Sequence, residues 1–201
     1  MIHASDTEAA RKAASVLISG GVIIYPTETL YGVGATATNA ASVEKVFTIK
    51  GRPHGNPIPV LGRDLKMLEE VAEFNDTART LSKKFWPGAL TLVLKDLGRL
   101  PKLITAGTGK AAVRVSAHHF VAKLFEELDA PLTSTSANPS GGGNLLDFNQ
   151  LCDEFIGRVE LIIDSGNIPP SKGSTVVDLT TTPPEILREG DLSIAKLKEF
   201  F

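Results

Sequence analysis

Cysteine is almost absent from this sequence, since Cys152 is the single one among 201 residues. One cysteine cannot form an intramolecular disulfide, and its isolation fits a reducing compartment. Cys152 stands in an apolar helical pattern without a neighbouring histidine. We therefore interpret it as a core residue and not as a nucleophile.

Long apolar runs are also missing. No stretch has enough consecutive apolar residues to span a bilayer, and the N-terminus lacks a basic region followed by an apolar run. From these two absences we expect a cytoplasmic protein with no membrane partner.

Net charge and aromatic residues are scarce as well. The formal net charge is -2 and aromatic residues make up 6% of the chain. This excludes a global positive field that would attract nucleic acid, so any surface that binds polyanions must be local. With 42% hydrophobic and 22% charged residues, the composition is that of a globular protein whose length fits one large domain or two small ones.

Predicted helices and strands alternate along the whole chain, which favours one α/β domain over two. A capping box of Ser5 and Glu8 is expected to open the first helix, and Asn39 to cap the second. Pro59 makes one short strand an edge or a bulge. Helices are predicted over residues 5–18, with residue 5 as the cap, 39–50, 64–70, 76–85, 117–128 and 147–156 and from 193; strands over 22–25, 58–61, 90–94, 112–115, 159–163 and 174–179, with a last short strand and turn over 186–190; and loops over 26–35 and 96–110, the second one mobile.

A group of cations stands at the end of the second predicted helix, in Lys50-Gly51-Arg52-Pro53-His54-Gly55-Asn56-Pro57. Glycine and proline should stiffen this segment, so both charges are expected to project from a rigid loop. A guanidinium fork beside a compact ammonium suits a phosphate or a carboxylate. The alternative is that Lys50 and Arg52 only complement the negative end of the helix and point into water.

Two further segments are rich in hydroxyl groups. Residues 26–35, Pro-Thr-Glu-Thr-Leu-Tyr-Gly-Val-Gly-Ala, follow a predicted strand at the position where ligands of α/β sheets usually bind, although a structural turn is the alternative. Residues 133–143 combine four hydroxyl side chains and an amide with a glycine loop. Glu28 could orient Lys50 or Arg52 or satisfy the loop backbone, and we favour the structural role.

Several kinds of site are disfavoured by their motifs. No nucleophile stands with a base, and His118 and His119, as neighbours on a helix, cannot converge on one metal, so we interpret them as a surface or capping pair. Gly107-Thr108-Gly109-Lys110-Ala111 lacks the first glycine and the final hydroxyl of a Walker A loop. Residues 32–37 match Gly-x-Gly-x-x-Ala, but no acidic residue is well placed for a ribose.

Six segments together resemble, in order, the YrdC-like domain family: Pro26-Thr27-Glu28-Thr29-Leu30-Tyr31-Gly32-Val33-Gly34, Lys50-Gly51-Arg52-Pro53, Trp86-Pro87-Gly88, Ala112-Val113-Arg114-Val115, Ser134-Thr135-Ser136-Ala137-Asn138-Pro139-Ser140-Gly141 and Ser174-Thr175-Val176-Val177-Asp178. The resemblance extends from about Gly20 to Gly190. It implies a single domain over residues 1–201, with a twisted open mixed sheet flanked by helices and a concave, positively charged cavity.

The resemblance also implies an activity, that of a nucleotidyltransferase. Such a protein condenses L-threonine, bicarbonate and ATP into L-threonylcarbamoyl-AMP and pyrophosphate, with Mg²⁺ brought by ATP and no metal held by the protein. A separate tRNA threonylcarbamoyl transferase complex then modifies an adenosine beside the anticodon. Weak contact with tRNA or double-stranded RNA is a further expectation. The reaction needs no protein nucleophile, but it needs two anions brought together and charge stabilised as pyrophosphate leaves.

The resemblance assigns roles to nine residues: a catalytic tetrad of Lys50, Arg52, Ser136 and Asn138; threonine-binding Thr29, Arg114 and Ser174; and ATP-binding Asn56 and Arg188 together with Lys50, Arg52 and Asn138. Arg114 is expected to pair with the threonine carboxylate.

Three residues depart from the family pattern. Leu61 stands where longer members tend to have a histidine near threonine, Lys110 replaces a small hydroxyl residue before a strand, and Leu146 falls near an expected hydroxyl. We expect them to alter substrate affinity and nucleotide contacts, and not the class of reaction.

Two other functions remain open. A non-catalytic RNA-binding module would use the same cations on an RNA backbone, although its expected basic excess and stacking aromatic residues are missing. A carbamoyl-adenylate domain of the hydrogenase-maturation type would use carbamoyl phosphate, and the stand-alone length disfavours it.

Overall fold

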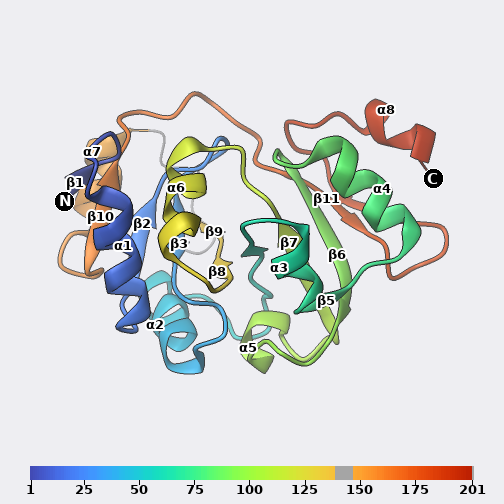
Figure 1. The fold of residues 1–201 in the computed structure, drawn as a ribbon, viewed down its shortest axis with the longest axis horizontal. Helices are drawn as coiled ribbons and strands as arrows, with labels where there is room; N and C mark the ends of the chain where they lie inside the picture. Colours follow the sequence, from blue (N-terminus) through green and yellow to red (C-terminus); the bar gives the residue numbers. More distant parts are fainter. Residues whose placement is uncertain (139–146, 201) are drawn as a thin grey trace.

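The protein is described here by a computed structural model, which describes residues 1–138 and 147–200 (Figure 1). Helices and strands interleave along the chain. The helices are α1 (Ala9–Ile18), α2 (Ala40–Lys50), α3 (Leu65–Glu69), α4 (Asp76–Phe85), α5 (Lys102–Thr105), α6 (His119–Glu127), α7 (Phe148–Phe155) and α8 (Ile194–Leu197). The strands are β1 (Ile2–His3), β2 (Ile23–Tyr25), β3 (Gly32–Gly34), β4 (Val60–Leu61), β5 (Ala72–Glu73), β6 (Leu90–Asp96), β7 (Lys110–Arg114), β8 (Leu132–Thr133), β9 (Thr135–Ser136), β10 (Leu161–Asp164), β11 (Thr175–Asp178) and β12 (Glu185–Arg188).

The described strands form two mixed sheets. The smaller has the order β1-β10-β2-β3-β9, and the larger has the order β12-β11-β6-β7-β4-β8, with β5 paired to β6. Parallel and antiparallel pairs occur in both, since β2 is parallel to β10 and antiparallel to β3, and β6 is parallel to β11 and antiparallel to β7. The predicted α/β class with a twisted mixed sheet is confirmed, although the strands divide between two sheets instead of joining one.

Residues 132–136 connect the two sheets. β8 pairs with β4 of the larger sheet, and β9 pairs with β3 of the smaller one. Between them, the backbone N–H of Ser134 donates to the carbonyl of Pro59 at 2.7 Å. The hydroxyl-rich part of segment 133–143 is therefore strand, and the predicted glycine loop that follows it, within residues 139–143, lies outside the described residues.

Capping explains where several helices begin and end. The Asn39 side chain accepts from the N–H of Ser42, and Gly51, with φ of 57°, ends α2 in the left-handed conformation, as the sequence predicts. The predicted capping box of α1 is wrong. Its N-cap is Glu8, which makes no side-chain capping bond, and the Ser5 hydroxyl instead lies 2.7 Å from Nδ1 of His3.

Three loop and edge predictions are also corrected. β4 lies between β7 and β8 and is not an edge, and Pro59 is tolerated because it precedes the paired residues. The expected loop over 96–110 contains α5, and the expected loop over 26–35 contains β3. No helix among the described residues is long and apolar enough to cross a membrane.

Candidate active site

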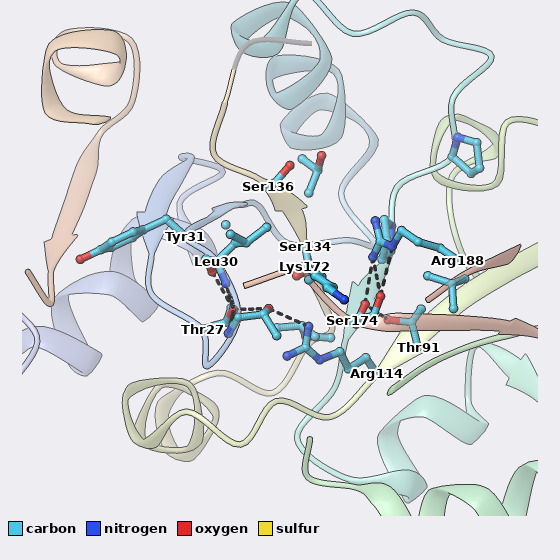
Figure 2. Close-up of a pocket in the computed structure, with 18 of the residues that line it drawn as sticks. Thr27, Leu30, Tyr31, Thr91, Arg114, Ser134, Ser136, Lys172, Ser174 and Arg188 are labelled. Carbon is cyan, nitrogen blue, oxygen red and sulfur yellow. Dashed lines mark hydrogen bonds between the residues drawn. The ribbon is translucent and has the colours of Figure 1, made fainter. Parts of the chain in front are cut away.

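A cavity of about 330 Å³ is lined by residues from both sheets and from the loops that follow their strands (Figure 2). Both sheets contribute to its wall, β3 and β9 from the smaller one and β4, β6, β7, β11 and β12 from the larger. Six of the nine predicted site residues line it: Thr29, Arg52, Arg114, Ser136, Ser174 and Arg188. The other three, Lys50, Asn56 and Asn138, are not part of the wall.

Lys50 lies directly behind the wall, at the end of the buried face of α2. Its side chain is only 5% exposed, and its ammonium donates to the carbonyls of Ser136 and, at 2.6 Å, Asn138. Lys50 therefore neither projects from a loop nor points into water, and both of these expected orientations are wrong. Burial, together with the nearby charge of Arg52, lowers the pKa of Lys50 to about 8.

The Ser-x-Asn pair forms a local turn that Lys50 holds. The Ser136 hydroxyl donates to Oδ1 of Asn138, and the Asn138 N–H donates to the Ser136 carbonyl at 2.9 Å. Asn138 is 8% exposed. Because Arg52 lines the same cavity as Ser136, and Lys50 binds both Ser136 and Asn138, the structure brings the four tetrad residues together.

Arg52 is held by the loop that follows it. Its Nε donates to the Asn56 carbonyl at 3.1 Å and its Nη2 to the Pro57 carbonyl at 2.8 Å. The loop is attached to α2 through His54, whose ring lies edge-on to Phe47 at 5.4 Å between centroids. Asn56 thus uses its backbone here, and it is an exposed residue outside the cavity wall.

Arg114 lines the same cavity from the end of β7 and is 5% exposed. Its Nη2 donates to Oε1 of Glu28, its Nη1 to the Thr29 hydroxyl at 3.2 Å and its Nε to the Gly88 carbonyl at 2.9 Å. The sequence-based interpretation of Glu28 is therefore corrected: Glu28 pairs with Arg114, and not with Lys50 or Arg52.

The charge of Glu28 is maintained although the carboxylate is largely buried. Burial alone raises its pKa, but the Arg114 guanidinium and a hydrogen bond from the Ser116 hydroxyl outweigh this effect and hold the pKa below its usual value. Glu28 is thus ionised at neutral pH and compensates the charge of Arg114.

The hydrogen bond from Arg114 to the Gly88 carbonyl gives the Trp-Pro-Gly motif a structural role. The Gly88 N–H donates to the Val115 carbonyl at 2.9 Å, which places the Gly88 carbonyl against Arg114. A Cβ on Gly88 would lie 2.6 Å from the Phe85 carbonyl oxygen, so only glycine fits. The motif is a structural support for the arginine.

Arg188 and Ser174 form a third group, on β12 and just before β11. Nε and Nη2 of Arg188 donate to the Ser174 carbonyl at 3.1 and 2.8 Å, and the Ser174 hydroxyl lies 2.7 Å from that of Thr91 (Figure 2). Thr91 was missed in the sequence because it stands inside an apolar strand. Lys172 was also missed as a cavity residue, whereas Ser134, which lines the wall too, belongs to the hydroxyl-rich segment that the sequence analysis singled out.

The Gly-x-Gly pattern of residues 32–34 is explained by packing. It lies in β3 and not in a strand-to-helix turn. A Cβ on Gly32 would lie 2.9 Å from Cζ of Tyr25, and one on Gly34 would lie 2.7 Å from Cε1. The two glycines therefore make room for the buried Tyr25 ring, whose hydroxyl donates to the Thr133 carbonyl.

The described wall of the cavity is rich in cations. Arg52, Arg114, Lys172 and Arg188 line it, and no aspartate or glutamate is among its described lining residues. Within residues 1–138 and 147–200, no group of three or more histidine, cysteine, aspartate and glutamate side chains could hold a metal ion. The arrangement is suited to an organic anion.

The three departures from the family pattern fall in different places. Leu61 is buried in the cavity wall, so it touches the site. Lys110 lies outside the described wall and pairs with Asp178 at 2.7 Å. Leu146 lies outside the described residues.

Comparisons with known proteins agree with these observations. A family model for Sua5, YciO and YrdC, described as "Telomere recombination", matches residues 15–190. A threonylcarbamoyl-AMP synthase of Pyrococcus abyssi is 39% identical over 190 residues, which are 94% of this chain and 56% of that protein. One from Bacillus subtilis is 36% identical over 184 residues, 90% of this chain and 53% of that protein. The chain thus spans about half the length of these relatives.

Structural similarity extends over the same region. The crystal structure of P. abyssi Sua5 complexed with L-threonine superimposes with a TM-score of 0.91 at 38% sequence identity. The superposition covers 95% of this chain and 56% of that one.

Proposed function

The chain belongs to the Sua5/YciO/YrdC family, and on that basis we propose that it is an L-threonylcarbamoyladenylate synthase, a nucleotidyltransferase. It would condense L-threonine, bicarbonate and ATP into L-threonylcarbamoyl-AMP and release pyrophosphate. One observation carries the proposal: a single cavity contains an arginine whose charge is compensated by a carboxylate, Arg114 with Glu28, and separate cations, Arg52 and Arg188, that are held by backbone carbonyls and a hydroxyl without a carboxylate partner.

The Arg114 side is proposed to bind threonine. The hydrogen bonds made with described residues use three of the five N–H groups of Arg114, so two remain for the threonine carboxylate. Thr29 and Ser174 contribute hydroxyl groups to the same wall. The crystal structure of P. abyssi Sua5 with L-threonine supports this choice of substrate.

The remaining cations are proposed to bind ATP. Arg52 and Arg188 line the cavity, and Lys50 lies behind it with one N–H beyond those given to Ser136 and Asn138. Mg²⁺ would enter bound to the phosphates and keep most of its ligands as water and phosphate oxygens, since it rarely needs a protein cage. When bound, it would neutralise part of the charge on the phosphates.

The proposed chemistry needs positioning and charge. The threonine amino group combines with bicarbonate and loses water to give a carbamate, whose oxygen attacks the α-phosphorus. The bond to the β-phosphate breaks, and its electrons leave with pyrophosphate. Arg52 and Lys50 would stabilise the developing negative charge, and removal of one such preorganised donor typically costs about 10²- to 10³-fold in rate.

The product would then pass to a tRNA threonylcarbamoyl transferase complex in the cytoplasm. Direct contact with tRNA or double-stranded RNA would be weak, because the net charge of -2 provides no long-range attraction.

The experiment is to measure pyrophosphate release from ATP by the purified protein with bicarbonate and Mg²⁺, with and without L-threonine. L-Serine and L-valine are matched controls, since each lacks one feature of the threonine side chain. Threonine-dependent release and a product with the mass of threonylcarbamoyl-AMP are expected. Absence of release with every amino acid, while RNA binds with a steep salt dependence, would favour the non-catalytic RNA-binding module instead.

A further inference from the structure

Lys172 differs from the other cations of the cavity wall. Arg52, Arg114 and Arg188 each donate to protein acceptors. The ammonium of Lys172 has no hydrogen-bond or ion-pair partner among residues 1–138 and 147–200. A charged group that faces a cavity without a protein partner retains all its donors for a ligand.

The main chain that carries Lys172 is firmly held. Its N–H donates to Oδ1 of Asp191 at 2.9 Å, and the Asp191 N–H returns a bond to the Gly173 carbonyl at 2.9 Å. Gly190 packs against the same segment so closely that a Cβ there would lie 2.2 Å from the Gly173 carbonyl oxygen. The stem of Lys172 therefore has a fixed origin at the wall of the cavity.

Asp191 does not neutralise the Lys172 side chain. One carboxylate oxygen accepts from the Lys172 backbone and the other from the Ser171 hydroxyl at 2.6 Å. Asp191 forms no ion pair with the Lys172 ammonium within 4.0 Å. The carboxylate thus orders the segment and leaves the lysine charge to the cavity.

The position of Lys172 indicates what it would meet. Figure 2 shows its side chain between Ser134 and Ser174, with Arg188 beyond Ser174. Lys172 is an exposed residue of the cavity wall, so it lies where the cavity meets solvent. A leaving group that must return to solvent passes this side.

We propose that Lys172 is a further phosphate-binding residue of this cavity, whose ammonium contacts the terminal phosphates of the nucleotide and then the pyrophosphate that leaves. A compact ammonium with three rotatable donors suits a phosphate whose position changes during the reaction. The inference rests on the proposed function only in naming ATP as the source of the phosphates.

The experiment compares ligand binding by calorimetry to the wild-type chain and to Lys172→Ala, Lys172→Arg and Lys123→Ala. Lys123 is an exposed lysine of α6 outside the described cavity wall, so its variant controls for the lost charge. Lys172→Ala is expected to weaken binding of inorganic pyrophosphate and of ATP about tenfold. Binding of AMP and of L-threonine should stay unchanged, and Lys172→Arg should recover most of the loss.

Three results would overturn the inference: unchanged pyrophosphate affinity in Lys172→Ala, an equal loss with AMP, or a loss confined to L-threonine. Because pyrophosphate binding is measured without turnover, it separates this inference from the proposed function. A chain that makes no adenylate but loses pyrophosphate affinity in Lys172→Ala would contradict the synthase and support the phosphate contact.

Discussion

The two sides of the cavity hold their cations by different means. Arg114 is paired with a carboxylate, Glu28, while Arg52 and Arg188 are held by backbone carbonyls. Lys50, behind the wall, is also bound to carbonyls. A carbonyl fixes the orientation of a cation and adds no net charge, whereas a carboxylate also cancels it. The Arg114 side therefore presents an oriented guanidinium whose charge is cancelled, and the side of Arg52 and Arg188 presents oriented guanidinium groups that keep their positive charge.

This difference corresponds to the charges of the two proposed substrates. L-Threonine is a zwitterion without net charge, and its carboxylate needs a directed donor more than an attractive field. The phosphates of ATP carry several negative charges, which uncompensated cations attract. The four predictions below test this division, beginning with the largest expected effect.

Arg52→Ala tests the positive side. The guanidinium contacts only loop carbonyls among the described residues, so its removal should leave the fold intact. We expect threonine-dependent pyrophosphate release to fall by about 10²- to 10³-fold, because a preorganised charge near the reacting phosphate is lost. Steady-state kinetics and thermal unfolding measure the two effects. A variant that unfolds at ordinary temperature would show that the loop cation is structural.

Glu28→Ala tests the neutral side. Removing one partner of a buried ion pair leaves Arg114 uncompensated, and we expect a loss of about 3 kcal/mol in the free energy of unfolding. Threonine affinity should fall by about tenfold or more because the guanidinium loses its orientation. ATP affinity should not fall, since the cavity becomes more positive.

Glu28→Gln is the matched control for that experiment, because it keeps an acceptor for Arg114 without the charge. Its threonine affinity should lie between those of the wild type and Glu28→Ala. Equal losses of threonine and ATP affinity in Glu28→Ala would contradict a division of the cavity into two sides.

The contact tested by these variants could not be predicted from the sequence. Arg114 and Glu28 are 86 residues apart, and so are Lys50 and Ser136. Local patterns do not report which distant strand ends meet. The sequence therefore identified the cations through the family motifs, but it did not show that Glu28 pairs with Arg114 or that Lys50 binds the carbonyls of Ser136 and Asn138.

The same limit applies to the fold. Asn39 and Gly51 identified the ends of α2 because capping chemistry is local. β8 and β9 have two residues each, too few to show an alternating pattern. The division into two sheets depends on these short strands, so one sheet was expected where there are two.

The shifted pKa of Lys50 predicts a smaller effect, a change of the free energy of unfolding with pH whose sign can be stated. The pKa is about 8 in the native protein and 10.5 as the ordinary value, so the unfolded chain binds more protons between these two values. The stability contribution of Lys50 should therefore rise with pH across this window.

If the reaction needs the ammonium, the rate of pyrophosphate release should fall about fivefold from pH 8 to pH 9.

Lys50→Met isolates this titration from that of other groups. Subtracting its unfolding free energy from that of the wild type at each pH should leave a difference that rises with pH above 8. A difference that does not change with pH would mean that the ammonium titrates in the native protein as it does in the unfolded chain.

The smallest effect is expected for Asn56→Ala. The family resemblance places Asn56 near ATP, but its exposed side chain is not part of the described cavity wall, and the carbonyl that accepts from Arg52 belongs to the backbone. Alanine keeps that carbonyl, so ATP affinity and pyrophosphate release should change by about twofold or less, within the usual range of surface substitutions. A tenfold loss of ATP affinity in this variant, which retains Arg52, would show that the loop turns the Asn56 side chain toward the nucleotide on binding. The positive side of the cavity would then be completed by its ligand, whereas the neutral side is already assembled around Arg114.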